Sequence, residues 1–229
     1  MADRSVLVTG ATGGLGRAVA AAFVSAGWRV VVPVRPASDP SRAPAGALAV
    51  EADLTDPESV AAAVAEAAGE PGAPLRAVVN LVGGFASGGL VHETPLADFE
   101  RMLTLNLRPT YLVTSAALPH LVESGGGAIV CVSSRAAVAP FAGAAGYVTS
   151  KAAVIAFASA VAVEYKTAGV RCNTVLPSVI DTPANRAAQP EADHSRWVPP
   201  AEIAEVIRFL AGPESAPVNG AAIPVYGRA

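Results

Sequence analysis

The chain alternates between short apolar runs and longer segments in which apolar residues recur every three or four positions. The short runs are rich in β-branched residues and lack alternation between polar and apolar positions, which is typical of parallel strands covered on both faces. Seven runs predict strands: 5–10, 29–34, 47–53, 76–84, 128–134, 170–178 and 221–226. The longer segments predict helices near 16–27, 57–69, 95–122, 147–166 and 199–212.

This order of elements predicts one α/β fold. Strands that alternate with helices form right-handed βαβ units, whose strands are parallel and whose helices cover both faces of the sheet. A chain of 229 residues suits one large domain of this kind. We therefore expect a single doubly wound domain over residues 1–229, with a parallel sheet of about seven strands.

Composition narrows the range of partners. The formal net charge is −3 and no basic run occurs, so we expect neither nucleic acid nor a membrane surface as a partner. The N-terminus lacks the features of a signal peptide, and no uncharged stretch has the length of a membrane span. Cys131 and Cys172 lie in apolar runs without a Cys-x-x-Cys motif, which indicates reduced core residues and a cytoplasmic protein. The three histidines lack metal-ligand spacing, so no metal is expected.

A glycine-rich turn joins the first predicted strand to the first predicted helix. The stretch "VLVTGATGGLGRAVA" (6–20) contains Gly10, Gly14 and Gly16. Glycine lets the backbone turn sharply and approach a pyrophosphate, which the N–H groups at the helix N-terminus then bind. Because the strand precedes the glycines and the helix follows them, the motif predicts a dinucleotide site.

The end of the second predicted strand bears on the choice of dinucleotide. Many such sheets have an acidic residue there, which binds the ribose 2′-hydroxyl of NAD, whereas this chain has Val34 followed by Arg35. A guanidinium suits the 2′-phosphate of NADP, so NADP(H) is favoured and NAD(H) stays possible. The alternative is that Arg35 is a solvated loop residue.

Tyr147 and Lys151 lie four residues apart in a predicted helix and share one face. The other positions of that stripe are apolar or Tyr: 154, 155, 158, 161, 162 and 165. A lysine on so apolar a stripe needs a partner or a functional reason. We interpret the pair as a proton donor and a cation that lowers its pKa. The alternative is a core tyrosine beside a lysine whose stem extends to solvent.

With these motifs assembled, the chain resembles the short-chain dehydrogenase/reductase family over nearly its full length. The resemblance implies a Rossmann fold and an NAD(P)(H)-dependent oxidoreductase that acts on a small carbonyl or alcohol substrate. It implies four catalytic residues: Asn106, Ser134, Tyr147 and Lys151. It implies that the cofactor is bound by Gly10, Thr12, Gly14, Leu15, Gly16, Arg35, Asp53, Leu54, Asn80, Gly83, Tyr147, Lys151, Pro177 and Thr182.

The same resemblance implies a role for each catalytic residue. Tyr147 would be the general acid and base, Ser134 would hold the reacting heteroatom, and Lys151 would assist Tyr147 and orient the ribose. Asn106 would anchor a water of the proton path. Phe85, Phe141 and Trp197 are candidate walls for a heterocycle or a ring ketone. A homodimer or homotetramer is implied, with contacts through the helices near 95–122 and 147–166.

A narrower resemblance links two stretches, 82–89 and 175–197, to the dihydropteridine reductases. The chain departs from that group because it keeps Ser134 and has Val34–Arg35 after the second strand. Two alternatives therefore accompany the carbonyl reductase hypothesis. One is a dihydropteridine-type reductase that acts on a pterin with NADH, and the other is a non-catalytic dinucleotide-binding regulator.

Overall fold

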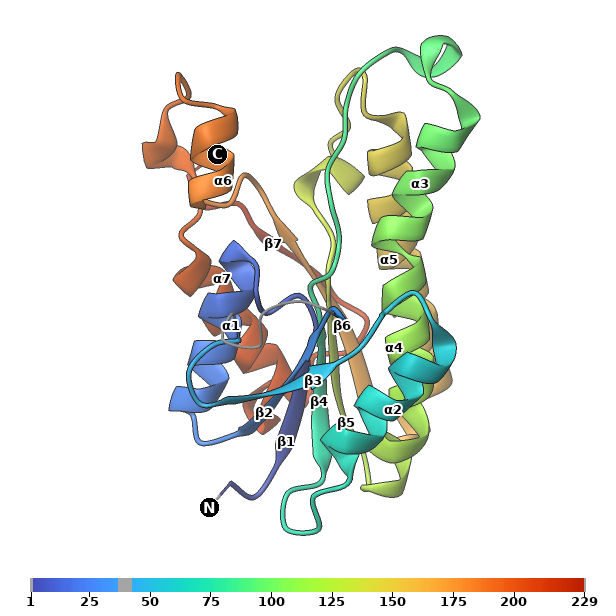
Figure 1. Ribbon diagram of the computed structural model, residues 1–229, viewed down its shortest axis with the longest axis vertical. Coiled ribbons are helices and arrows are strands. Elements are labelled where there is room, and N and C mark those ends of the chain that lie inside the picture. The colour runs from blue at the N-terminus through green and yellow to red at the C-terminus, as the bar shows by residue number, and fades with distance from the viewer. Residues whose placement is uncertain (1, 37–42, 229) are drawn as a thin grey trace.

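One parallel sheet of seven strands forms the centre of the protein (Figure 1). The computed structural model describes residues 2–36 and 43–228. The strand order is β3-β2-β1-β4-β5-β6-β7, and every neighbouring pair is parallel. The strands are β1 (Ser5–Val8), β2 (Arg29–Val34), β3 (Ala47–Glu51), β4 (Leu75–Asn80), β5 (Gly127–Val132), β6 (Val170–Pro177) and β7 (Ala222–Val225). Each lies within or next to one predicted run, and the α/β fold class is confirmed.

Helices cover both faces of this sheet. Figure 1 shows α1 and α7 on one side of the strands and α2, α4 and α5 on the other. The helices are α1 (Gly14–Ser25), α2 (Pro57–Ala68), α3 (Leu96–Asn106), α4 (Arg108–Glu123), α5 (Ala145–Glu164), α6 (Pro183–Ala188) and α7 (Pro200–Ala211). The sheet is thus the middle layer of three.

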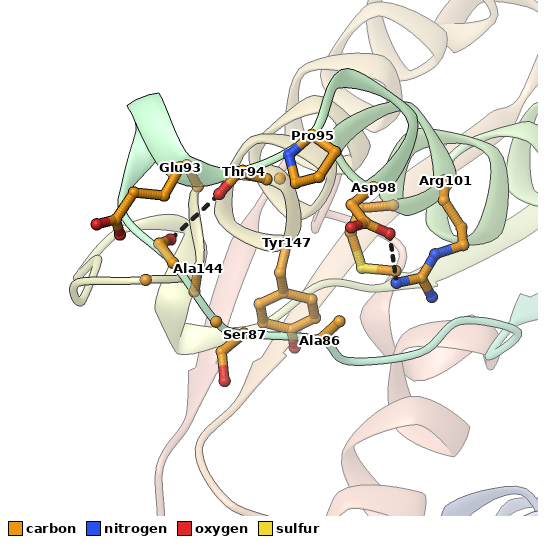
Figure 2. A pocket seen from close by; sticks show the side chains of 15 residues that line it. Ala86, Ser87, Glu93, Thr94, Pro95, Asp98, Arg101, Ala144 and Tyr147 are labelled. Carbon is orange, nitrogen blue, oxygen red and sulfur yellow. Dashed lines mark hydrogen bonds and ion pairs between the residues drawn. The ribbon is translucent and has the colours of Figure 1, made fainter.

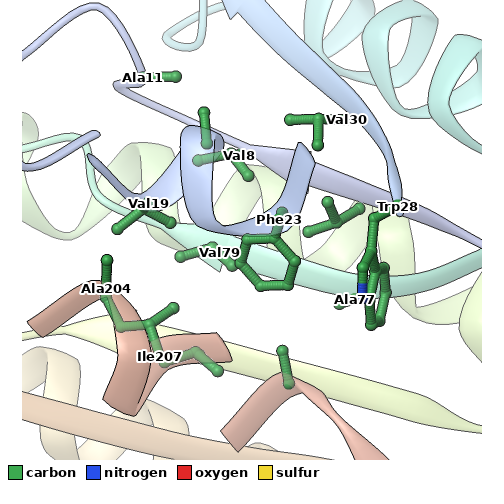
Figure 3. Close-up of a cluster of buried hydrophobic side chains, with 14 of the residues drawn as sticks. Val8, Ala11, Val19, Phe23, Trp28, Val30, Ala77, Val79, Ala204 and Ile207 are labelled. Carbon is green, nitrogen blue, oxygen red and sulfur yellow. The ribbon is translucent and has the colours of Figure 1, made fainter. Parts of the chain in front are cut away.

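The core lies on both sides of the sheet, which explains the missing alternation along the strands. Val6 and Val8 belong to the apolar cluster beneath α1 and α7, whereas Leu7 belongs to the opposite cluster, and all three are fully buried. Figure 3 shows the first cluster, in which Phe23 meets Trp28 edge to face at a centroid distance of 5.2 Å. Burial on both faces requires apolar residues at consecutive positions.

The predicted helix near 95–122 is in fact two helices. It breaks at Leu107, where α3 ends and α4 begins. Pro109 accounts for the break, because proline has no N–H for the helical hydrogen bond and its ring clashes with the carbonyl four residues earlier. The break places Asn106 and Arg108 at the junction between the two helices. Side-chain and main-chain groups at this junction can contribute to a functional site.

The switch in strand order lies between β1 and β4. From β1 the chain adds β2 and β3 on one side, and from β4 it adds β5, β6 and β7 on the other. Ligands of open α/β sheets bind in the crevice at the carboxyl ends of the strands at such a point. The turns after β1 and β4 are therefore brought together at the predicted dinucleotide site.

Helix α5 is long and apolar enough, by length and composition alone, to cross a membrane. It nevertheless packs on the sheet, with Val154, Ala158 and Val161 buried in the second apolar cluster. It also carries Lys151, whose side chain is buried at the carboxyl edge of the sheet. These contacts are those of a core helix, and we interpret α5 as a helix that packs on the sheet of this domain.

Candidate active site

The glycine-rich turn between β1 and α1 has a backbone that side chains would disrupt. Gly10 has a φ of +67°, a region that favours glycine. A Cβ on Gly16 would overlap the carbonyl oxygen of Gly10 and lie 2.6 Å from the Cα of Ala11. The turn therefore depends on glycine at these two positions for its own folding.

The same turn fits a dinucleotide pyrophosphate. Gly13 is the N-cap residue of α1 and has no side chain to satisfy the first N–H groups of the helix. Thr12 and Leu15 flank these groups, and a Cβ on Gly14 would lie 2.6 Å from Cγ2 of Thr182. Thr182, five residues after Pro177 at the end of β6, therefore packs directly against the turn. Uncapped N–H groups and the positive helix end favour a phosphate.

The turn after β3 carries Asp53 at the side of the crevice that β2 and β3 form. Its Oδ1 accepts hydrogen bonds from the N–H of Thr55 at 2.8 Å and from the Thr55 hydroxyl at 2.7 Å. These bonds, assisted by the cations of Arg35 and Arg108, lower the pKa of Asp53. Leu54 is partly buried, whereas Val34 is buried and Arg35 is exposed. The predicted adenosine-binding residues thus share one end of the crevice.

Two predicted cofactor-binding residues, Asn80 at the end of β4 and Gly83 in the turn after it, have different surroundings. Asn80 is buried, and its Nδ2 donates to Oγ1 of Thr114 at 3.0 Å, so it braces the end of the strand. Gly83 lies against the catalytic candidates, since a Cβ there would be 2.5 Å from Oδ1 of Asn106 and 3.1 Å from Nζ of Lys151. Gly83 therefore allows the turn to approach both residues.

Tyr147 and Ser134 lie side by side at the carboxyl ends of the central strands. Burial raises the pKa of Tyr147, and the neighbouring Ser134 hydroxyl partly offsets that rise. The direction differs from our expectation that Lys151 lowers this pKa. The reason is that burial outweighs every other influence on the phenol. Nζ of Lys151 donates instead to the carbonyl of Val132 at 3.1 Å, beneath the crevice. In the protein without cofactor, Tyr147 is a weaker acid than a free tyrosine.

Lys151 is itself strongly affected by burial, which lowers the pKa of its ammonium group to about 8. The unfolded chain would hold this proton up to about pH 10.5, the ordinary value for lysine. The folded protein therefore releases the proton first. The buried ammonium therefore lowers the free energy of unfolding below pH 8, and this destabilisation diminishes as the pH rises from 8 to 10.5.

We expect Lys151→Met to stabilise the protein without cofactor at pH 7, although the variant should lose activity. Removal of the buried ammonium should raise the free energy of unfolding by at most about 3 kcal/mol. Loss of its hydrogen bond to the carbonyl of Val132 should lower it by about 1 kcal/mol. Urea unfolding of both proteins across the alkaline range measures this, and their difference should shrink as the pH rises. A difference that does not change with pH would contradict the assignment.

Asn106 lies at the end of α3 and is fully buried. Its Oδ1 accepts from the N–H of Gly84 at 2.9 Å, and its Nδ2 donates to the carbonyl of Met102 and to Oγ of Ser150, each at 3.1 Å. Both N–H groups of the amide are therefore used within the protein. The side chain therefore links the turn after β4 to α3 and α5. These links fix the position of Gly83 relative to Tyr147.

Of the three candidate aromatic walls, Phe85 lies beside Tyr147 and Phe141 lies beside Phe85. Phe85 meets the Tyr147 ring edge to face at 5.0 Å, and Phe141 lies 6.3 Å from Phe85. Both phenylalanines are largely exposed, at 61% and 50%. Trp197 is buried and packs against His194, with the ring centroids 4.3 Å apart and the rings tilted at 50°, so it serves packing and does not form a third wall.

A cavity of about 130 Å³ adjoins the Tyr147 ring (Figure 2). It lies between the loop 86–89, the start of α3 and the segment 143–147. Asp98 and Arg101 form an ion pair at 3.3 Å on its wall. Sequence reasoning did not find these lining residues, because no motif marks them and only the fold brings them to Tyr147.

A glycine-lined cradle at the switch point, with a tyrosine, a serine and a buried lysine beside it, defines a dinucleotide-dependent oxidoreductase. Comparison with known proteins identifies the family. The sequence profile of the family described as "short chain dehydrogenase" matches residues 4–193, and the chain belongs to this family. It is an oxidoreductase of the short-chain dehydrogenase/reductase type.

Named relatives match over almost the whole chain. The 2-(R)-hydroxypropyl-CoM dehydrogenase of Xanthobacter autotrophicus is 35% identical over an alignment of 245 positions, which covers 98% of each chain. The cis-4-hydroxycyclohexanecarboxylate dehydrogenase of Sinomonas cyclohexanicum is 36% identical and covers 99% of this chain and 96% of its own. Among solved structures, ElxO with NADP bound superimposes with a TM-score of 0.91 at 27% identity, over 98% of each chain.

Proposed function

We propose that the protein interconverts a small carbonyl compound and its alcohol, with NADP(H) as the redox partner. The observation that carries this proposal is the pairing of the Tyr147 and Ser134 hydroxyls at the crevice, with Lys151 buried one helical turn behind. Dehydrogenases of alcohols among the relatives support it. A tyrosine and a serine can hold one oxygen atom between them, which is the arrangement that a carbonyl requires.

The nicotinamide supplies or accepts the hydride when the cofactor is bound. In the direction of reduction, Ser134 donates a hydrogen bond to the substrate oxygen, and Tyr147 transfers its phenolic proton to that oxygen as negative charge develops there. Tyrosine is protonated at neutral pH even at its ordinary pKa, and burial raises the pKa of Tyr147 further, so its proton is available to the substrate oxygen. Lys151, whose ammonium donates to the carbonyl of Val132 beneath the crevice, would orient the ribose of the bound cofactor beside Tyr147.

Arg35 supports NADP(H) as the preferred cofactor. It is exposed at the carboxyl end of β2, and no carboxylate precedes it because Val34 occupies that position. A guanidinium can bind a 2′-phosphate through two parallel hydrogen bonds, which a ribose 2′-hydroxyl cannot match. The NADP complex of ElxO is consistent with this choice.

We expect Arg35→Met to raise the dissociation constant for NADPH by roughly tenfold or more and to leave that for NADH within about twofold. The reason is that only the phosphate contact is removed. Titration of wild type and variant with each nucleotide, followed by nicotinamide fluorescence, measures both constants. If the wild-type protein binds NADH more tightly than NADPH, the NADP(H) proposal fails and a dihydropteridine-type reductase becomes the leading alternative.

The exposed Phe85 and Phe141 rings support a substrate with a flat or ring-shaped apolar part. The position of Phe85 beside Tyr147 would place such a ring next to the reacting oxygen. The cyclohexane-ring dehydrogenase among the relatives agrees with this class. A screen of cyclic ketones with NADPH, alongside open-chain ketones of equal size, tests the proposal.

The same proposal includes a homodimer or homotetramer in the cytoplasm. Exposed apolar side chains occur on α4 and α5, such as Tyr111 at 52% and Val163 at 70% exposure, and would be covered by a second copy. Two free buried cysteines suit a reducing compartment. Sedimentation velocity distinguishes the monomer from these assemblies.

A further inference from the structure

Two arginines flank the turn that carries Asp53. Arg35 follows β2, and Arg108 is the first residue of α4, where it contacts Thr55 of the turn. Both side chains are exposed. Both also act on the Asp53 carboxylate, whose pKa is lowered chiefly by the Thr55 hydrogen bonds and further by these two cations. The adenosine end of the crevice therefore has two positive charges around one negative charge.

A hydrogen bond fixes Arg108 at this place. Its Nη2 donates to the carbonyl oxygen of Thr55 at 3.1 Å. The N–H and hydroxyl of Thr55 in turn hold the carboxylate of Asp53. A guanidinium has five N–H donors in a planar fork, so one bond to the main chain leaves most of them for a ligand.

We propose that Arg108 is a second specificity-determining cation of the cofactor site, which acts with Arg35 to favour an adenosine that carries a 2′-phosphate. This inference rests on the proposed use of NADP(H). It goes beyond the motif residues, none of which lies on α4. Two arginines at one end of the site attract a doubly charged phosphate far more than a neutral hydroxyl. Because the Arg108 guanidinium already holds one hydrogen bond, it should lose little side-chain conformational entropy when the nucleotide binds.

Fragments of the cofactor test the role of Arg108 directly. Calorimetric titration of wild type, Arg108→Met and Arg108→Lys uses three probes: adenosine 2′,5′-bisphosphate, adenosine 5′-monophosphate and reduced nicotinamide mononucleotide. We expect Arg108→Met to weaken the bisphosphate roughly tenfold, the monophosphate less than about threefold and the nicotinamide fragment less than about twofold. Arg108→Lys keeps the charge and should retain most of the affinity.

Arg208→Met is the matched control, because Arg208 is a partly exposed arginine on α7 that pairs with Glu205 and lies outside the crevice. It should leave all three affinities unchanged. Equal weakening of both adenosine ligands, weakening of the nicotinamide fragment, or equal losses in Arg108→Met and Arg108→Lys would each overturn the inference. If the wild-type protein itself does not prefer the bisphosphate, the NADP(H) proposal has failed, which separates that failure from the role of Arg108.

Discussion

Tyr147→Phe is expected to lower kcat for carbonyl reduction by roughly a thousandfold, with NADPH affinity within about threefold of wild type. The substitution removes only the phenolic hydroxyl, which is the proton donor in our account. The ring stays, and with it the edge-to-face contact with Phe85 at 5.0 Å. Steady-state kinetics on the best ketone from the screen, with a parallel nucleotide titration, separate loss of chemistry from loss of binding.

Tyr165→Phe is the control for this variant. Tyr165 caps the end of α5 and packs against the second apolar cluster, away from the crevice. Removal of its hydroxyl should leave kcat within about twofold. Substantial activity in Tyr147→Phe would mean that another group donates the proton, and the assignment of Tyr147 would be wrong.

Gly16→Ala is expected to lower the free energy of unfolding by more than about 3 kcal/mol and to abolish cofactor binding. The added methyl group would overlap the carbonyl of Gly10 and crowd the Cα of Ala11, and both are backbone atoms that cannot move without opening the turn. The same shift would displace the first N–H groups of α1, which we propose bind the pyrophosphate.

Gly13→Ala offers a matched change in the same turn. A Cβ at Gly13 would have its nearest neighbour at an ordinary 3.4 Å, and the residue has an extended backbone with φ of −81°. Its free energy of unfolding should stay within about 1 kcal/mol of wild type. Thermal and urea unfolding of both variants without nucleotide measure the difference. Equal stability of the two variants would contradict the packing argument.

The fold was largely predictable because burial on both faces of the sheet leaves a strong sequence signal. Val6, Leu7 and Val8 point alternately into two cores, so the strand reads as a solid apolar run. The break at Leu107 was harder to predict, since Pro109 lies within a segment whose helical period continues on both sides. A proline near a helix start is favourable, so its presence alone does not reveal where one helix ends.

The parts of the site whose geometry depends on local sequence spacing could be predicted. The parts whose geometry depends on tertiary contacts could not. Tyr147 and Lys151 share a helix face by spacing alone, but the burial that sets their pKa values follows from tertiary packing. The Asn106 bonds to Gly84 and Ser150 join segments that only the fold brings together. For the same reason no motif pointed to Arg108, which reaches Thr55 across 53 positions of sequence.

Transfer of hydride from NADPH to a carbonyl carbon can be followed directly with a deuterated cofactor. NADPH that carries deuterium at both C4 positions is mixed with wild-type protein and cyclic ketones, and the products are analysed by mass spectrometry and NMR. We predict alcohol with one deuterium on the former carbonyl carbon, formed by wild type and lost in Tyr147→Phe. Binding of NADPH without deuterium transfer to any carbonyl compound in the panel would contradict the central claim that this site reduces carbonyl groups.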